Sequence, residues 1–146
     1  MTGQLVDYEA IFHNLPIPAL VLTPQLKIVD MNQSYLQISG RPREGLVGKD
    51  LFEAFPENPD EPSSTSAANL GASLQRVLAT RASDVMPLQR YDVEVPGSPG
   101  EFRERYWCPE NVPVIDDSGQ VRFIVHVVEE VSDLIRKFVE AEAANA

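Results

Sequence analysis

The sequence predicts a single α+β domain with an antiparallel β-sheet. Its 146 residues match the length of one domain, and a chain of this length buries enough surface to fold without a disulfide or a metal. Hydrophobic residues make up 43% of the chain and charged residues 23%, the balance of a folded globular protein. The expected elements run in the order helix, two strands, several helices, three strands and a final helix. Because strands and helices are grouped in this order, it favours α+β over alternating α/β.

The chain begins with an expected amphipathic helix. Its apolar stripe has the i, i+3, i+4, i+7 spacing of one helical face and consists of Tyr8, Ile11, Phe12 and Leu15. Asp7 stands at the N-cap position, and Pro16 and Pro18 end the helix because proline cannot continue its hydrogen bonds. The stripe is a candidate cover for the outer face of the sheet.

Two short strands follow and predict a β-hairpin. They span residues 19–22 and 26–31, with a Thr-Pro-Gln turn between them. Asn32 is then the expected N-cap of a helix over residues 33–39, which Gly40 ends as a C′ residue.

The middle of the chain combines a short apolar turn, a loop and the longest helix. Residues 51–55 form the apolar turn, and residues 56–66, rich in Pro, Ser, Asp and Glu, predict the loop. The helix that follows has Ser63 or Ser64 as its expected N-cap. Its apolar stripe consists of Ala67, Leu70, Leu74, Val77 and Leu78.

The last third of the chain is expected to form three strands. They span residues 88–95, 102–115 and 121–131, with turns rich in Gly, Pro, Asp and Ser between them. Pro109 and Pro113 lie in the second of these strands and favour an edge position or a bulge there.

The last strand is apolar on both of its faces, which indicates that both faces of the sheet are covered. One face has Phe123, Val125 and Val127, and the other has Ile124 and Val128. After this strand, Ser132 is expected to cap a closing helix. The residues of that helix expected to point inward are Leu134, Ile135 and Phe138.

Charge and cysteine content argue against several classes of function. The chain has 12 Lys and Arg against 22 Asp and Glu, and its net charge of −10 repels phosphate backbones and anionic lipids. We therefore expect no nucleic-acid partner and no membrane contact; no apolar run approaches the ~20 residues of a membrane span. Residues 1–4 lack the basic start of a secretory signal. The single cysteine, Cys108, excludes an internal disulfide and is expected to be a packed thiol, so a cytoplasmic location is the simplest.

Several short patterns, in the right order, resemble a PAS domain. Residues 28–36, followed by Gly40, Glu44, Leu46 and Gly48, resemble its opening, in which a hydrophobic strand and an Asn precede Gly, Glu, Leu and Gly at set spacing. Gly45 departs from the family by replacing a frequent Glu.

The end of the chain extends the resemblance. Residues 113–116 with Gly119 resemble the usual turn into the last PAS strand, and residues 130–132, Glu-Val-Ser, stand where PAS domains commonly have Asp-Ile-Thr. The longer acid at Glu130 departs from that pattern. The resemblance covers residues 7–136 and is greatest to PAS domains that precede bacterial sensor histidine kinases.

The resemblance implies a five-stranded sheet of order 2-1-5-4-3 with helices on one face. It divides the chain into an N-terminal flanking helix (1–16), a sensory core (17–131) and a C-terminal signalling helix (132–146). The implied function is a sensory module that couples a small ligand or partner to a downstream output domain, for which a histidine kinase is the expected class. Two alternatives stay open: an interaction-only PAS domain that dimerises without a ligand, and a small cone-shaped α+β enzyme.

Five residues are candidates for a ligand-binding site on the sheet. They lie on three neighbouring strands and are Arg90, Asp92, Trp107, Asn111 and His126. Strand alternation places them on one face if the register stays regular through Pro109, with Arg90 paired to Asp92 and the indole N–H of Trp107 free for a ligand. The alternatives are a structural histidine, a packed tryptophan with a capping asparagine, and a solvated surface ion pair.

No catalytic residues and no bound cofactor are expected. The chain has no G-x-S-x-G, P-loop or H-E-x-x-H motif. By the resemblance, a covalent flavin would need a Cys within residues 51–80 and haem a His within residues 67–80, and both are absent there. We therefore expect no visible absorbance band, no metal site and no enzymatic activity, although an unidentified small molecule remains compatible with the sequence.

The first and last helices are expected to mediate a weak homodimer. Apolar residues of the last helix follow the 3–4 spacing of a coiled-coil seam and are Val131, Leu134, Phe138 and Ala141. In the families that the chain resembles, such an exit helix continues into the output domain.

Overall fold

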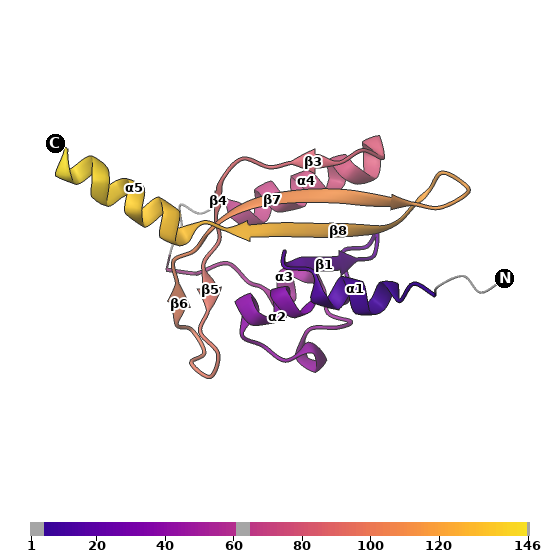
Figure 1. Ribbon diagram of the computed structural model, residues 1–146, viewed down its shortest axis with the longest axis horizontal. Coiled ribbons are helices and arrows are strands. Elements are labelled where there is room, and N and C mark those ends of the chain that lie inside the picture. Colours follow the sequence, from indigo (N-terminus) through magenta and orange to yellow (C-terminus); the bar gives the residue numbers. More distant parts are fainter. Residues whose placement is uncertain (1–4, 61–64, 146) are drawn as a thin grey trace.

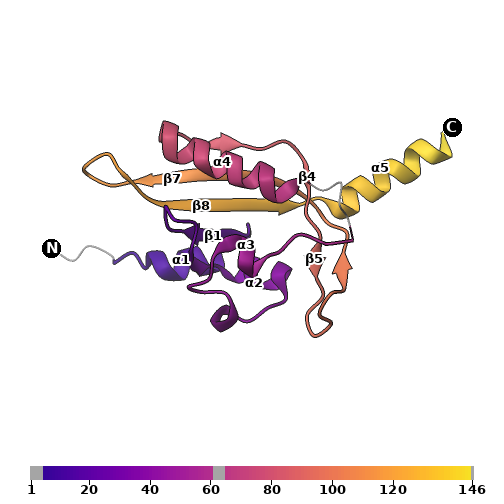
Figure 2. The same cartoon turned by 180° about the vertical axis from the view of Figure 1, so that it is seen from behind.

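The computed structural model describes residues 5–60 and 65–145. Its centre is an antiparallel sheet, and the two longest strands, β7 (Tyr106–Ile115) and β8 (Val121–Glu130), run side by side through the middle of the molecule (Figure 1). Helix α4 (Ser66–Thr80) lies along one face of these strands, as Figure 2 shows. The architecture is the expected α+β class.

The strand order confirms the central position of the last strand. The sheet runs β2 (Ile28–Met31), β1 (Ala19–Leu22), β8, β7 and β3 (Asp84–Val85), and β4 (Gln89–Arg90) also pairs with β7. This is the predicted order 2-1-5-4-3, with the third strand divided into two short pieces.

The first helix, α1 (Tyr8–Asn14), begins and ends as predicted but does not cover the sheet. Asp7 caps it by accepting a hydrogen bond from the Ala10 N–H at 3.0 Å. None of its residues is buried, and the side chain of Tyr8 is 75% exposed. The helix lies beside α2 (Gln33–Ser39) instead, so the prediction that it covers the outer face is wrong.

The hairpin and α2 agree closely with the sequence. The hairpin turn extends one residue beyond Leu26, whose φ of +66° closes it, so β2 starts later than expected. Asn32 caps α2 by accepting from the Tyr35 N–H at 3.1 Å, and Gly40 ends the helix at a φ of +64°. An added Cβ at Gly40 would lie 2.8 Å from Pro96, so only glycine fits at this helix end.

The helices on the inner face pack their apolar side chains against the sheet. Helix α3 (Leu51–Ala54) is capped by Asp50, and α4 has no side-chain cap at Thr65. The predicted caps Ser63 and Ser64 lie outside the described residues. The Glu57 carboxylate accepts from the Ala67 N–H at 2.7 Å, so a loop side chain takes the capping role for α4.

The expected third strand is interrupted. After β4 the chain leaves the main sheet, and β5 (Val93–Glu94) pairs with β6 (Phe102–Arg103) in a separate two-stranded sheet, visible beside the main sheet in Figure 1. The carbonyl of Tyr91 accepts a hydrogen bond from the Trp107 indole at 2.7 Å instead of joining a strand ladder. The predicted strands 88–95 and 102–115 are each divided by this detour.

The long strand pair keeps a regular register through Pro109. Pro109 lies opposite Val128, and the only shift falls between Val114 and Ile115. On the other edge of β7, β3 pairs with residues 110–111 and β4 with residues 106–107. Pro109 lies between these two stretches, so its missing N–H interrupts neither pairing.

The two faces of the sheet differ in burial. On β8, Ile124, His126 and Val128 are buried, whereas Phe123 and Val127 on the opposite face are only partly buried. The prediction that both faces are covered is therefore wrong for the described part of the chain. Cys108 also lies on this outer face and is exposed, so it is not the packed thiol that we expected.

The last helix, α5 (Ser132–Ala144), projects away from the sheet (Figure 1). Only Ser132 is buried, and Leu134 and Phe138 are 65% and 63% exposed. The expectation that Leu134, Ile135 and Phe138 point inward is wrong, with Ile135 half-buried at the helix base. Within residues 5–60 and 65–145, no helix has the length and apolarity required to cross a bilayer.

Candidate functional site

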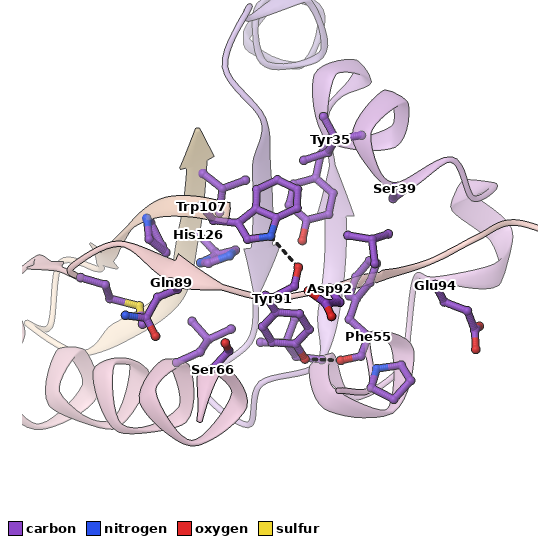
Figure 3. A pocket seen from close by; sticks show the side chains of 18 of the residues that line it. Tyr35, Ser39, Phe55, Ser66, Gln89, Tyr91, Asp92, Glu94, Trp107 and His126 are labelled. Carbon is purple, nitrogen blue, oxygen red and sulfur yellow. Dashed lines mark hydrogen bonds between the residues drawn. The ribbon is translucent and has the colours of Figure 1, made fainter. Parts of the chain in front are cut away.

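A small cavity lies between the inner face of the sheet and helices α2, α3 and α4. Its volume is about 80 Å³. Much of its wall is apolar and includes Ile38, Leu51, Phe55, Leu70, Met86 and Val128. The polar side chains in the wall include Tyr35, Ser39, Gln89, Asp92, Trp107 and His126 (Figure 3). An apolar enclosure with a few polar groups is the usual form of a small-molecule site.

The structure brings three of the five predicted site residues to this cavity. Asp92, Trp107 and His126 line it, whereas Arg90 and Asn111 do not. The ligand role of these residues stays a prediction.

The pairing of β4 with β7 explains why Arg90 lies outside the cavity wall. Gln89 is opposite Trp107 in the ladder and takes the inward position, and Arg90 is opposite Tyr106. The regular alternation that would place Arg90 and Asp92 on one strand face ends where the chain leaves the sheet.

Arg90 and Asp92 form the expected ion pair despite this break. Arg90 Nε lies 3.0 Å from Asp92 Oδ1, and Nη2 lies 3.1 Å from Oδ2. Asp92 also accepts from Asn58 Nδ2 at 2.9 Å. Burial raises the pKa of Asp92, but the hydrogen bonds from Arg90 and Asn58 outweigh it and hold the pKa below its usual value. The carboxylate in the cavity wall is therefore ionised and already paired.

Trp107 contributes its ring to the cavity and has no free N–H for a ligand. The indole Nε1 donates to the Tyr91 carbonyl at 2.7 Å (Figure 3), so the expectation of a free donor at this residue is wrong. Gln89 is occupied in the same way, because its side-chain oxygen accepts from Asn69 Nδ2 at 2.9 Å and its amide donates to backbone carbonyls.

His126 is buried and connected to the surface by a series of polar contacts. Its Nδ1 lies 2.7 Å from Asn111 Oδ1, and Asn111 Nδ2 lies 2.8 Å from Ser73 Oγ. Ser73 is hydrogen-bonded to Asp84, which pairs with Arg76 Nη2 at 2.9 Å. Burial lowers the pKa of His126 to about 4, so the ring is neutral near pH 7. Asn111 thus holds the histidine from behind the cavity wall.

Tyr35 is a cavity residue that the sequence analysis did not select. It lies three residues after the cap of α2, on the buried side of that helix, and its ring meets Phe55 edge-on at 5.9 Å. Burial raises its pKa, so the phenol is neutral. No described residue hydrogen-bonds to its hydroxyl, and every fully buried side-chain nitrogen and oxygen in residues 5–60 and 65–145 has a partner. The hydroxyl is therefore open to the cavity, which agrees with its orientation in Figure 3.

The described residues offer no metal-binding cluster. Within this part of the chain, no group of three His, Cys, Asp or Glu side chains is arranged to hold an ion. The open polar atoms of the cavity are suited to hydrogen bonding with an organic molecule.

Comparisons with known proteins give a consistent result. A family model described as the PAS fold matches residues 12–136. No curated protein matches the sequence significantly.

Solved structures share the fold at low sequence identity. The PAS domain of a protein from Colwellia psychrerythraea has a TM-score of 0.67 and 11% identity, covering 86% of this chain and 95% of that one. A sensory box sensor histidine kinase from Vibrio cholerae gives 0.53 and 19%, covering 85% and 88%. The PAS domain, in complex with ethanol, of a LuxR-family transcriptional regulator from Burkholderia thailandensis gives 0.59 and 16%, covering 87% and 99%.

Proposed function

Because this chain belongs to the PAS fold family, we propose that it is a sensory domain whose cavity binds a small molecule and whose last helix passes occupancy to an output domain. One observation supports the binding step above all. Much of the cavity wall is apolar, yet the hydroxyl of Tyr35 and the Nε2 of His126 have no hydrogen-bond partner among the described residues. A ligand with polar groups would satisfy both atoms.

The cavity volume suits a ligand of a few non-hydrogen atoms. A buried water needs about 10–15 Å³ of such volume, so a cavity of about 80 Å³ has space for roughly five to eight non-hydrogen atoms. The related domain from Burkholderia thailandensis was solved in complex with ethanol, a molecule that fits within this volume.

A direct structural path links the cavity wall to α5. β8 contributes His126 and Val128 to the wall and reaches α5 at Ser132. The Ser132 hydroxyl accepts from the backbone N–H of Tyr106 at 2.9 Å, next to Trp107 in the wall. A ligand that shifts Trp107 or β8 therefore also shifts the base of the exit helix.

The exposed face of α5 supports an interaction beyond this domain. Leu134 and Phe138 lie on one side of the helix, and Tyr8 and Ile11 of α1 are exposed as well. We propose that both helices contribute to a weak homodimer and that α5 continues toward an output domain, with a histidine kinase as the leading class. The same surfaces favour, as the second candidate, an interaction-only domain that dimerises with an empty cavity.

A matched pair of substitutions tests the binding step. Val128→Phe fills the cavity, whereas Val127→Phe places the same side chain on the outer face of the same strand. Alcohols, ketones and carboxylic acids of up to about eight non-hydrogen atoms are titrated against each protein, and native mass spectrometry reports oligomeric state and co-purified ligand. We expect Val128→Phe to weaken binding about tenfold or more and Val127→Phe to leave it unchanged.

Each failure of this test has a distinct meaning. A wild-type protein that dimerises and binds none of these compounds is an interaction-only domain. Turnover of any compound identifies an enzyme. Equal binding by wild type and Val128→Phe places the ligand outside the cavity.

A further inference from the structure

A series of hydrogen bonds runs from Arg76 at the surface to His126 in the cavity wall, and the charges of Arg76 and Asp84 determine which group donates in each of them. The Arg76 guanidinium is always protonated and pairs with Asp84, so Asp84 is an ionised acceptor. The hydrogen between Ser73 and Asp84 must therefore come from the serine hydroxyl. A hydroxyl has a single hydrogen, and Ser73 thus has only an acceptor left for its second contact.

This acceptor determines how the Asn111 amide is oriented. Asn111 must present its NH₂ group to Ser73, and its carbonyl oxygen then faces His126 Nδ1 at 2.7 Å. Two oxygen or nitrogen lone pairs cannot face each other at this distance, so Nδ1 must carry a proton. Asn111 is fully buried, and its amide also contacts the Met86 sulfur, so no water replaces these partners.

A neutral imidazole with its proton on Nδ1 has a lone pair on Nε2. No described residue donates to this atom, and no fully buried side-chain nitrogen or oxygen of the described segments lacks a partner. Nε2 is therefore open to the cavity that His126 lines. Across the same cavity, the neutral Tyr35 phenol has a hydroxyl hydrogen without an acceptor among the described side chains.

We infer that the network from Arg76 to Asn111 fixes His126 as a hydrogen-bond acceptor, and that the cavity selects neutral ligands that both donate and accept, of which a hydroxyl group is the smallest. This inference rests on the proposed binding function. A hydroxyl donates to His126 Nε2 and accepts from Tyr35. Ethers and ketones only accept, and so do carboxylates, so these groups leave Nε2 unsatisfied.

The first test measures the histidine itself and needs no ligand. Long-range ¹H–¹⁵N NMR of the imidazoles distinguishes a proton on Nδ1 from one on Nε2, and His13→Gln assigns the two histidines of the chain. We expect His126 to carry its proton on Nδ1. Its presence on Nε2 would overturn the inference.

Two serine substitutions test the network. Ser73→Ala removes the acceptor for Asn111 and is expected to release the tautomer preference of His126. Ser118→Ala is the matched control, because Ser118 also donates to a carboxylate, Asp116, at 2.6 Å, but lies in the distant β7–β8 turn. An unchanged tautomer in folded Ser73→Ala would contradict the role of the network. If Ser73→Ala does not fold, Asp84→Asn at the surface end of the network is used in its place to test the tautomer of His126.

The second test compares three probes of similar size: 1-butanol, its isomer diethyl ether, and butyrate. We expect 1-butanol to shift the amide resonances of cavity residues and the other two to bind about tenfold more weakly or not at all. Equal affinity for alcohol and ether would overturn the selectivity. Failure of all three to bind would overturn the proposed function instead, and the tautomer result would stand independently.

Discussion

At the scale of single residues, the side-chain amide of Asn32 joins three segments of the fold. Its Oδ1 accepts from the backbone of Tyr35 at 3.1 Å and of Ala19 at 3.0 Å, and its Nδ2 donates to the Ile17 carbonyl at 2.8 Å. The same residue therefore begins α2, fixes the start of β1 and sets the position of Tyr35 in the cavity wall. Each of these backbone groups would cost about 1–3 kcal/mol if buried without a partner.

His126 makes the stability of the domain depend on pH in a defined window. Burial lowers its pKa from the ordinary value of 6.5 to about 4, so the unfolded chain takes up a proton over this range that the folded chain excludes. His126 therefore does not reduce the free energy of unfolding above pH 6.5. As the pH falls toward 4, its exclusion of a proton reduces this free energy by about 3 kcal/mol in total. Urea unfolding between pH 7 and 4.5 measures this slope.

The two histidines provide a matched control for the pH slope. His126→Gln removes the buried titrating group and should flatten the slope, whereas His13→Gln should retain it. Asp92 has a pKa below its usual value, and its contribution is lost only at lower pH, outside this window. A slope that persists in His126→Gln would show that another group is responsible.

At the scale of elements, α5 has an apolar face that the domain itself does not cover. The double substitution Leu134→Glu with Phe138→Glu is expected to weaken the homodimer about tenfold or more. Because both side chains are exposed, the stability of the monomer should change by no more than about 0.5 kcal/mol. Sedimentation velocity over a concentration series measures the dimer.

A control for this experiment has the same change in net charge. Arg136→Glu also alters the charge by two units, but it lies on the opposite side of α5 and makes only an exposed contact with Asp133. It should dimerise like the wild type. Loss of the dimer in both variants would indicate general repulsion, and a wild type that is monomeric at all concentrations would contradict the proposed interface.

Elements whose limits depend on neighbouring residues were predictable, and those set by distant contacts were not. The caps Asp7 and Asn32 and the end of α2 at Gly40 follow from adjacent sequence. At the break after Arg90, the carbonyl of Tyr91 accepts from the indole of Trp107, which is 16 residues away in the sequence. Arg90 was misplaced because the contact with Trp107 puts Gln89 on the inward face of β4, and adjacent sequence does not show which face that is.

Side-chain orientation explains the rest of the difference at the site. Trp107 and His126 were found because β7 and β8 keep a regular register, so alternation holds along them. Tyr35 was missed because a short helix has an apolar side whether or not a cavity lies beneath it. The orientation of α5 was also missed, since an apolar stripe alone does not show whether its partner belongs to the same domain.

At the scale of the whole molecule, strands β7 and β8 both line the cavity and hold the base of the exit helix α5. Gly40 at the end of α2 contacts Pro96 beside the β5–β6 pair, and Tyr91 is hydrogen-bonded to Phe55 across the cavity. The helical side and the sheet side of the cavity are thus connected at its edge, and the β8–α5 junction is fixed to β7 by Ser132. Ligand binding in the cavity is the central claim of this account.

The most direct test is a titration of ¹⁵N-labelled protein with 1-butanol, followed by amide chemical shifts. We predict shifts at cavity residues and at the base of α5, with about tenfold weaker binding by Tyr35→Phe, which removes only the open hydroxyl. Tyr106→Phe, which removes a hydroxyl bonded to Glu104 away from the cavity lining, should bind like the wild type. Equal affinity in Tyr35→Phe, or no shift at the cavity at saturating alcohol, would contradict the account.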